Sequence, residues 1–286
     1  MTFVTKAEQF TGPAAFHAEG PVWSPSWGGL RFVDMFAGDV LSVRPDGSIA
    51  RRHVDTIAAA LRPRRSGGAV IAVERGFVLA EPDGSLITLP EVWSDTALRM
   101  NEGGCDPQGR FYCGSIAYDQ APGAASLYRL DADRSVSFVF GDVTISNGLD
   151  WNLDGDIAYY VDSKTRRIDA FDYDAEKGFS GRRPLVALPD GVGSPDGLTV
   201  DADGYIWVAL YAGSAVHRYT PTGVLDGVVE LPVTQVTACT FGGAGLDELF
   251  ITTSRENLPD DVQPEAGSVY RCIPGVRGRA AVPFAG

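Results

Sequence analysis

The chain has 286 residues, of which 44% are hydrophobic and 21% are charged, a composition typical of globular proteins with a large core. A formal net charge of −13, with no basic cluster denser than Arg62, Arg64 and Arg65, excludes the positive surface that nucleic-acid binding requires. No run of eighteen hydrophobic residues occurs and the opening MTFVTKAEQF lacks a signal-peptide core, so we expect one domain over residues 1–286, in the cytoplasm, with no membrane partner.

Short strands and glycine-containing turns follow one another along the whole chain. Only DTIAAAL, residues 55–61, resembles a helix. Six segments each combine a hydrophobic strand, a polar turn and an alternating strand; in chain order they are GPVWSPSWGGLRFVDM, GAVIAVERGFVLAE, GGCDPQGRFYCGSI, GLDWNLDGDIAYYVDS, GLTVDADGYIWVAL and ACTFGGAGLDELFITTS. This pattern predicts an all-β protein.

The spacing of these segments predicts the architecture. Their turn glycines are Gly29, Gly76, Gly109, Gly155, Gly204 and Gly245, which are 47, 33, 46, 49 and 41 residues apart. Further strand signals, such as DVLSVRPDGS and ASLYRLDADRSVSFVF, lie between them. Four-strand repeats of about 43 residues are typical of β-propellers, so we predict a six-bladed β-propeller.

One position in each repeat is expected to line the central channel, because the first strand of a propeller blade faces the axis. Counting back from the turn glycines gives Glu19, Gly68, Asn101, Asn147, Asp196 and Thr237. Taken singly, Asn147 and Asp196 precede glycine and fit ordinary turns. Their recurrence at one offset, and the charge of Glu19 ahead of a hydrophobic strand, instead favour a polar ring.

Oxygen ligands in this ring predict one divalent cation. Glu19 and Asp196 supply carboxylates and Asn147 a carbonyl oxygen, a set that suits Ca²⁺, Mg²⁺ or Mn²⁺ and does not exclude Zn²⁺ or Fe²⁺. His17 lies two residues before Glu19, and we expect it near the site but not as a ligand. No G-x-S-x-G, P-loop or G-x-G-x-x-G motif is present, which leaves metal-assisted chemistry.

The four cysteines show no CxxC spacing and indicate neither a zinc site nor a redox motif. Cys105 and Cys113 flank DPQGRFY and could face each other across a hairpin. Reduced, buried thiols are the favoured interpretation in a cytoplasmic protein.

Four motifs stand in order between residues 18 and 210: AEGPVW, RMNEGGCDPQGRFYCGSI, ISNGLDWNLDGDIAYYVDS and SPDGLTVDADGYIWVAL. They are similar to the E-G-P-x-W, R-x-N-D-G-x-x-D-x-x-G-R-x-x-x-G-T, N-G-L and P-D-G motifs of the gluconolactonase, regucalcin (senescence marker protein) and luciferin-regenerating enzyme family. The resemblance implies a six-bladed propeller that hydrolyses sugar lactones around one divalent metal. By position it implies Glu19, Asn147 and Asp196 as metal ligands, and Asp196 also as general base.

The resemblance further implies that Arg99 and Asn101 bind the hydroxyl groups of the sugar. Glu102 stands where the family commonly has Asp, and Asp119 falls near a substrate-contacting Glu of some members. The segment IAYDQAPGAAS, after Gly114, is expected to form a lid-like loop over the channel. These departures leave the metal site intact and the identity of the lactone open.

Two other functions remain open at this point. A phosphotriesterase-like metal hydrolase on the same propeller would need a more apolar channel mouth, whereas Arg99 and Asn101 favour a hydroxylated substrate. A propeller that only binds a ligand would not need all three metal ligands. The sequence also leaves open which metal binds, whether Asp196 or the metal activates the attacking water, and the oligomeric state, because a closed ring has no unpaired edge strand.

Overall fold

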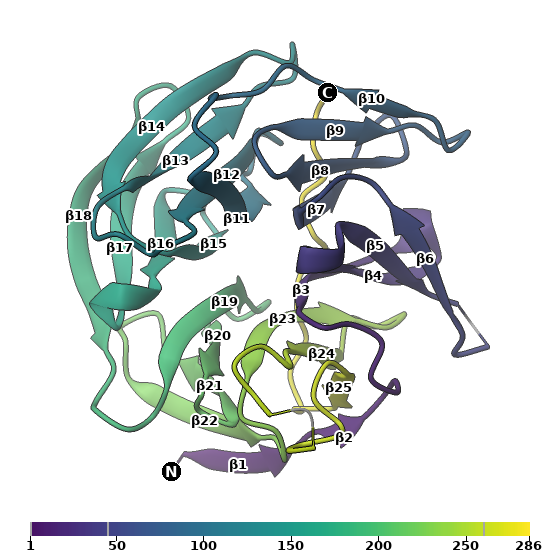
Figure 1. The fold of residues 1–286 in the computed structure, drawn as a ribbon. Helices are drawn as coiled ribbons and strands as arrows, with labels where there is room; N and C mark the ends of the chain where they lie inside the picture. Colours follow the sequence, from purple (N-terminus) through teal and green to yellow (C-terminus); the bar gives the residue numbers. More distant parts are fainter. Residues whose placement is uncertain (1, 45, 260) are drawn as a thin grey trace.

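The computed structural model contains six small sheets around a central axis (Figure 1). The structure describes residues 2–44, 46–259 and 261–286. Each sheet is built on consecutive antiparallel strands, and the first strand of each lies next to the axis (Figure 1). The predicted six-bladed β-propeller is therefore confirmed.

The blades are numbered in chain order. Blade 1 contains β3 (Ala18–Ser24), β4 (Gly29–Asp34), β5 (Asp39–Val43) and β6 (Ile49–His53), and blade 2 contains β7 (Ala58–Pro63), β8 (Ala69–Val73), β9 (Phe77–Ala80) and β10 (Leu86–Thr88). Blade 3 contains β11 (Leu98–Cys105), β12 (Phe111–Ala117), β13 (Ala125–Leu130) and β14 (Val136–Val143), and blade 4 contains β15 (Ser146–Trp151), β16 (Ile157–Asp162), β17 (Arg167–Asp174) and β18 (Gly178–Ala187). Blade 5 contains β19 (Ser194–Val200), β20 (Ile206–Tyr211), β21 (Ala215–Tyr219), β22 (Leu225–Glu230) and β1 (Phe3–Lys6), and blade 6 contains β23 (Val236–Gly242), β24 (Glu248–Thr253), β25 (Val269–Cys272) and β2 (Glu8–Gln9). The short 3₁₀ helices are η1 (Pro25–Trp27), η2 (Met35–Ala37) and η3 (Ser163–Thr165).

Blade 2 differs from the prediction in two places. The helix-like segment DTIAAAL contributes to the inner strand Ala58–Pro63, whose residues are almost all buried, so the strand shows no polar alternation. Gly68 is not on the inner strand but in the turn between β7 and β8, with a φ of +74°. The count failed because Gly76 joins β8 to β9, one strand further from the axis. The ring position of this blade is Ala59, at the bulge of β7.

Strands from the N-terminal region complete two blades formed by the C-terminal part of the chain. β2 pairs with β25 at the outside of blade 6, with Glu8 opposite Arg271. β1 runs parallel to β22 in blade 5, with Phe3 opposite Gly227. Backbone hydrogen bonds between segments far apart in the sequence therefore close the ring.

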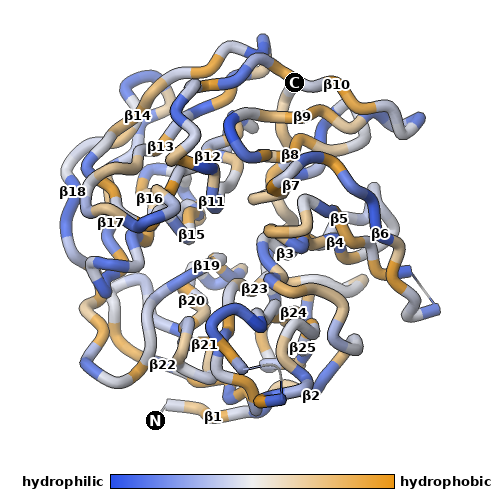
Figure 2. The backbone as a smooth tube through the Cα atoms, in the orientation of Figure 1, coloured by the Kyte–Doolittle hydropathy of each residue, from blue (hydrophilic) through white to orange (hydrophobic). Residues whose placement is uncertain are grey.

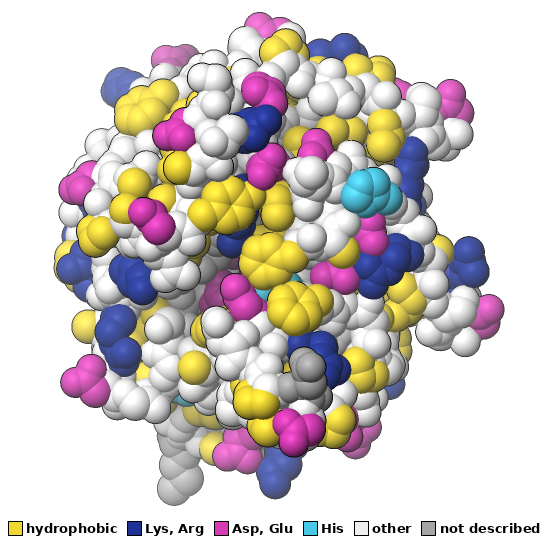
Figure 3. Space-filling view, viewed as in Figure 1, with side chains coloured by type: hydrophobic (Ala, Val, Ile, Leu, Met, Phe, Trp, Pro, Cys, Tyr) yellow, Lys and Arg dark blue, Asp and Glu magenta, His cyan; other side chains and the backbone are white. Residues whose placement is uncertain are grey.

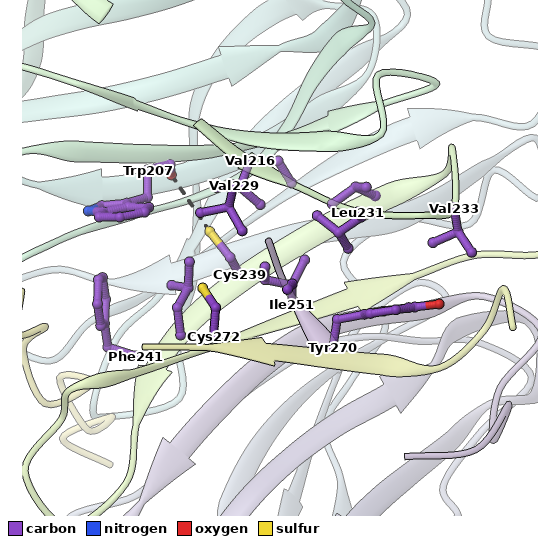
Figure 4. Packing of buried hydrophobic residues seen from close by; sticks show 14 of the residues in the cluster. Trp207, Val216, Val229, Leu231, Val233, Cys239, Phe241, Ile251, Tyr270 and Cys272 are labelled. Carbon is purple, nitrogen blue, oxygen red and sulfur yellow. Dashed lines mark hydrogen bonds between the residues drawn. The ribbon is translucent and has the colours of Figure 1, made fainter. Parts of the chain in front are cut away.

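The hydrophobic core lies between adjacent blades. Between blades 5 and 6, the rings of Trp207 and Phe241 meet edge to face with centroids 5.4 Å apart. Val216, Val229 and Ile251 are fully buried around them (Figure 4). Each blade thus buries its faces against its two neighbours, which fixes the inner strands around the channel.

All four cysteines lie in the part of the chain that the structure describes, and each is buried and free. Cys239 and Cys272 belong to the core between blades 5 and 6 (Figure 4). Cys105 and Cys113 do not face each other across the hairpin, because Gly103 is the residue opposite Cys113. The expectation of reduced thiols is confirmed.

A β-bulge in the inner strand accompanies the ring position of every blade. In β15 and β19 the pairing with the second strand is interrupted at Asn147 and Asp196, and the other four blades show a register shift at the matching place. A bulge removes a residue from the regular ladder and re-aims its side chain. Asn147 and Asp196 therefore lie inside strands and not in the turns that their following glycines suggest.

Those glycines let neighbouring inner strands approach closely. An added Cβ at Gly148 would lie 2.6 Å from the backbone nitrogen of Leu198, and one at Gly197 would lie 2.4 Å from the Cβ of Ala238. Any larger residue would push adjacent blades apart. The Asn-Gly and Asp-Gly pairs thus reflect packing between blades.

The inner strands around the channel differ in hydropathy. Hydrophilic residues occur on the inner strands β3, β11, β15 and β19, whereas β7 is hydrophobic near the axis (Figure 2). The C-terminal segment crosses behind the ring (Figure 1), where the backbone nitrogens of Phe284 and Ala285 donate to the carbonyl oxygens of Pro63 and Gly109.

No helix of the described residues has the length and hydropathy to cross a membrane.

Candidate functional site

A cavity of about 260 Å³ lies in the channel and is lined by side chains at the ring positions. In the space-filling view, charged side chains and a histidine are visible in the central hollow of this face, beside hydrophobic side chains (Figure 3). Five of the six predicted site residues line the cavity, and they come from blades 1, 3, 4 and 5: Glu19, Arg99, Asn101, Asn147 and Asp196. Residues about fifty positions apart in the sequence are thus brought to one place by the propeller.

Asp119, the sixth predicted residue, is not brought to the cavity. It is exposed in the loop between β12 and β13, where its carboxylate accepts a hydrogen bond from the backbone nitrogen of Ala121 at 2.9 Å. Gln120 lines the cavity instead. The left-handed backbone at Gln120, with a φ of +54°, turns the chain there, so the neighbouring side chain points elsewhere. The predicted lid segment therefore borders the cavity through Ile116 and Gln120.

The ring positions of the remaining two blades do not contribute polar groups to the cavity. The hydroxyl of Thr237 donates to the carbonyl oxygen of Ala18 at 2.6 Å, which joins blade 6 to blade 1 beside Glu19. Ala59 of blade 2 has no polar side chain. The polar side chains at the ring positions therefore come from blades 1, 3, 4 and 5.

A chain of hydrogen bonds orients the two ring amides. Arg99 Nη1 donates to Asn101 Oδ1 at 2.7 Å, and Asn101 Nδ2 donates to Asn147 Oδ1 at 3.0 Å. Asn147 Nδ2 donates to Ser163 Oγ at 2.7 Å, and Ser163 Oγ donates to the carbonyl oxygen of Pro195 at 2.7 Å. Since a carbonyl oxygen has two lone pairs, Asn147 Oδ1 keeps one for a further ligand.

Glu19 and Asp196 are buried carboxylates, 2% and 6% exposed. Burial, and then the charge of Glu102, raises the pKa of Glu19 well above its usual value, while Arg99 and the Gly20 N–H oppose this. Burial, and then the charge of Glu19, raises the pKa of Asp196 well above its usual value. Among the described residues, Asp196 Oδ1 is a buried oxygen without a hydrogen-bond partner. Buried negative charge of this kind calls for a positive ligand.

These residues fit a hard divalent cation. Two carboxylates and the oxygen of Asn147 form a set of oxygen donors that Ca²⁺, Mg²⁺ and Mn²⁺ prefer, with positions left for other ligands. Within residues 2–44, 46–259 and 261–286, no group of three or more His, Cys, Asp or Glu side chains is arranged to hold a metal ion. The amide of Asn147 is therefore an essential member of the candidate set.

Four cavity residues lie at or just after the ends of second strands and were not predicted from the sequence. Ser163 follows β16, Tyr211 ends β20, and Glu256 and Asn257 follow β24 closely; all four line the cavity. The repeat count considered only the first strand of each blade. Applying the same count to the end of the second strand would have found them. His17, expected near the site, also lines the cavity.

One side of the mouth is aromatic. Phe16 is 50% exposed and Tyr118 is 49% exposed. The rings of Phe16 and Phe36 lie 6.3 Å apart between centroids. The guanidinium of Arg99 lies 5.2 Å from the ring centre of Phe36 and 5.9 Å from that of Tyr118. Cation–π contacts from two sides therefore hold Arg99 in place.

A second cavity, of about 110 Å³, lies further along the same inner strands, next to the C-terminal segment. Glu102 and Arg62 line it. Glu102 is 6% exposed, and its Oε2 has no hydrogen-bond partner among the described residues. Burial raises the pKa of Glu102 from 4.5 to about 7, although the charge of Arg62 lowers it.

Glu102 predicts a pH dependence of folding stability. Below a pH of 4.5 both the folded and the unfolded chain carry the proton of Glu102, and the contribution of this group to stability is complete. As the pH rises from 4.5 to about 7, the unfolded chain releases the proton while the folded protein keeps it, so this contribution to the free energy of unfolding is lost. We expect the free energy of unfolding of the chelated wild-type protein to fall, relative to Glu102→Gln, between a pH of 4.5 and a pH of about 7. Urea denaturation at several pH values measures this.

The exposed Glu230 of β22 offers a matched control, because Glu230→Gln removes a carboxylate without changing a buried group. The prediction is wrong if the pH profiles of wild type, Glu102→Gln and Glu230→Gln run parallel. In that case Glu102 has the same pKa in the folded protein as in water.

Comparison with known proteins agrees with this geometry. Residues 17–255 match the SMP-30/Gluconolactonase/LRE-like region. Regucalcin of Oryctolagus cuniculus is 39% identical over 282 aligned residues, which cover 94% of each chain.

Solved structures share the whole fold. A luciferin-regenerating enzyme matches with a TM-score of 0.90 and 32% identity, covering 98% of this chain and 99% of its own. Regucalcin of Agrobacterium tumefaciens, described as a calcium-binding protein, matches with a TM-score of 0.90 and 26% identity over 99% of both chains. With six blades, the matching motifs and these similarities along nearly its full length, the chain belongs to the SMP-30/Gluconolactonase/LRE-like family.

Proposed function

We propose that this protein is a divalent-metal-dependent hydrolase that opens a sugar lactone to the aldonic acid. Membership of a family that includes gluconolactonase supports a lactonase-type activity. The observation that carries the proposal is the unpartnered, buried Oδ1 of Asp196, which lies with Glu19 and Asn147 on a polar cavity. Four buried free thiols fit a reducing compartment and support a cytoplasmic location.

In this proposal Glu19, Asn147 and Asp196 hold the cation. When bound, a divalent cation supplies positive charge that offsets the two carboxylates and polarises a carbonyl group. Asp196 would accept the proton of the water that attacks the lactone carbonyl carbon. The ring C–O bond then breaks, and the proton passes from Asp196 to the leaving oxygen, which gives a hydroxy acid.

Arg99 and Asn101 would orient the substrate in this proposal. Arg99 is held by Phe36 and Tyr118 and donates to Asn101, so both side chains are fixed before the substrate arrives. Both Nδ2 hydrogens of Asn101 donate to the Ser146 carbonyl oxygen and to Asn147 Oδ1, so the guanidinium of Arg99 would donate to hydroxyl groups of the lactone and Asn101 Oδ1 would accept. Because both side chains are fixed, little side-chain entropy is lost on binding.

For Arg99→Ala we expect KM to rise about tenfold, with kcat within about threefold of wild type, because one charged hydrogen-bond donor to the substrate is lost. Steady-state kinetics measures both constants. Arg183→Ala, on the outer strand β18, should match wild type, because Arg183 is exposed and far out in blade 4. A large fall in kcat with unchanged KM would assign Arg99 a role in the transition state instead.

A panel of aldonolactones with a pH indicator tests the proposed function. The protein is first treated with a chelator, and Ca²⁺, Mg²⁺, Mn²⁺, Zn²⁺ and Fe²⁺ are then added back separately. We expect acid release with at least one lactone, only after a metal is restored. Equal acid release before and after chelation would refute metal dependence. If no combination of lactone and metal gives acid release, the proposed lactonase activity is refuted.

The aromatic side of the mouth supports a second candidate, a phosphotriesterase-like hydrolase. Exposed Phe16 and Tyr118 offer the apolar surface that aryl or alkyl leaving groups need. The same panel therefore includes an aryl phosphotriester and an aryl ester, whose hydrolysis in preference to lactones would favour this candidate.

A further inference from the structure

His17 occupies a fixed position at the edge of the candidate site. Its backbone nitrogen donates to Asp34 Oδ1 at 3.2 Å, and its imidazole packs against Phe36 with centroids 4.8 Å apart. The residue is 7% exposed and lines the same cavity as Glu19. A backbone hydrogen bond and packing on the ring face therefore fix the position of His17.

Contacts at Nδ1 of His17 select one tautomer. Nδ1 lies 2.8 Å from Ser254 Oγ and 3.4 Å from Glu256 Oε2. A lone pair on Nδ1 would point toward the carboxylate of Glu256, whereas an N–H there is attracted to both oxygens. The arrangement favours a proton on Nδ1 and hence a lone pair on Nε2.

Nε2 of His17 is available to the cavity. Among the described residues Nε2 has no hydrogen-bond partner. It is also absent from the set of unpartnered polar atoms that are buried, so Nε2 is accessible from the cavity that His17 lines. With the proton on Nδ1, the lone pair of the imidazole lies on Nε2. A neutral, oriented Nε2 with an unused lone pair is a hydrogen-bond acceptor.

We propose that His17 is a substrate-binding residue, whose Nε2 accepts a hydrogen bond from a hydroxyl group of the bound substrate. The inference rests on the proposed lactonase function and narrows its substrate class to lactones with a hydroxyl group at the matching position. In the proposed function Asn101 and Arg99 bind substrate from blade 3, and His17 adds an acceptor from blade 1. Donors and acceptors together allow the site to distinguish hydroxyl patterns.

Three variants test this role. Gln at position 17 places an amide oxygen near the position of Nε2, whereas Leu removes the acceptor, so we expect His17→Gln to retain near-wild-type KM and His17→Leu to raise KM about tenfold. The kcat of both should stay within about threefold of wild type. His53→Gln, at an exposed histidine of β6, is the matched control and should match wild type.

A set of monodeoxy lactones locates the hydroxyl group. We expect one deoxy analogue on which wild type and His17→Leu have equal KM values, because the partner of Nε2 is missing there. An equal penalty on every analogue, or no penalty at all, would overturn the inference.

The nitrogen spectrum of His17 tests the geometry without turnover. The chain has three histidines, so ¹⁵N NMR with His17→Gln as assignment control can identify its two ring nitrogens. A proton on Nδ1 is expected, and a proton on Nε2 would overturn the inference even in an active lactonase. No hydrolysis by the wild-type protein, with the Nδ1–H tautomer present, would instead point to failure of the proposed function.

Discussion

Replacing Asp196 with asparagine is expected to lower the rate of lactone hydrolysis by about 10³-fold or more. The amide keeps the shape of the carboxylate but cannot accept the proton of the attacking water. It also removes one of two negative charges near the cation, so the metal Kd should rise. Initial rates with saturating metal and isothermal titration with the same metal measure the two effects separately.

Asp203→Asn is the matched control for this substitution, since Asp203 is an exposed carboxylate in the turn after β19 of the same blade. It should have wild-type activity and metal affinity. If Asp196→Asn with bound metal hydrolyses the lactone at the wild-type rate, Asp196 is not the general base.

For Glu19→Gln we expect at least about a hundredfold loss of metal affinity, because Glu19 supplies one of two charged ligands. In the wild-type protein, metal at a hundred times its Kd should raise the free energy of unfolding by about 3 kcal/mol, and the variant should lose most of this gain at the same concentration. Thermal or urea unfolding with and without chelator measures it.

Without metal, the expected effect of Glu19→Gln on the free energy of unfolding has the opposite sign. Its stability should equal or exceed that of the metal-free wild type, since a buried acid with a like charge nearby is replaced by a neutral group. This comparison separates a lost ligand from a damaged fold. An equal metal-induced stabilisation of wild type and Glu19→Gln would remove Glu19 from the metal site.

The sequence predicted much of the site because the propeller repeats. The inner strands of blades 3, 4, 5 and 6 share one offset between the ring position and the following turn, so counting residues placed Asn101, Asn147 and Asp196 together. The count failed in blade 2, where Gly76 lies in the turn between β8 and β9 and not in the turn that follows the inner strand. Asp119 was implied by the family resemblance and not by the count, and it lies in a loop whose direction depends on local backbone angles and not on the repeat.

The linear sequence by itself determined the number of blades, the all-β class, the free thiols and the family, since these depend on local strand pattern, turn residues and motif order. Only the tertiary structure decided which groups meet. Closing the ring brings Glu256 and Ser254 of blade 6 to His17, a contact between residues almost a full chain length apart. It also buries Asp196 Oδ1 without a partner. Burial, electrostatic coupling and tautomer choice depend on distances between blades, and no spacing along one strand contains them.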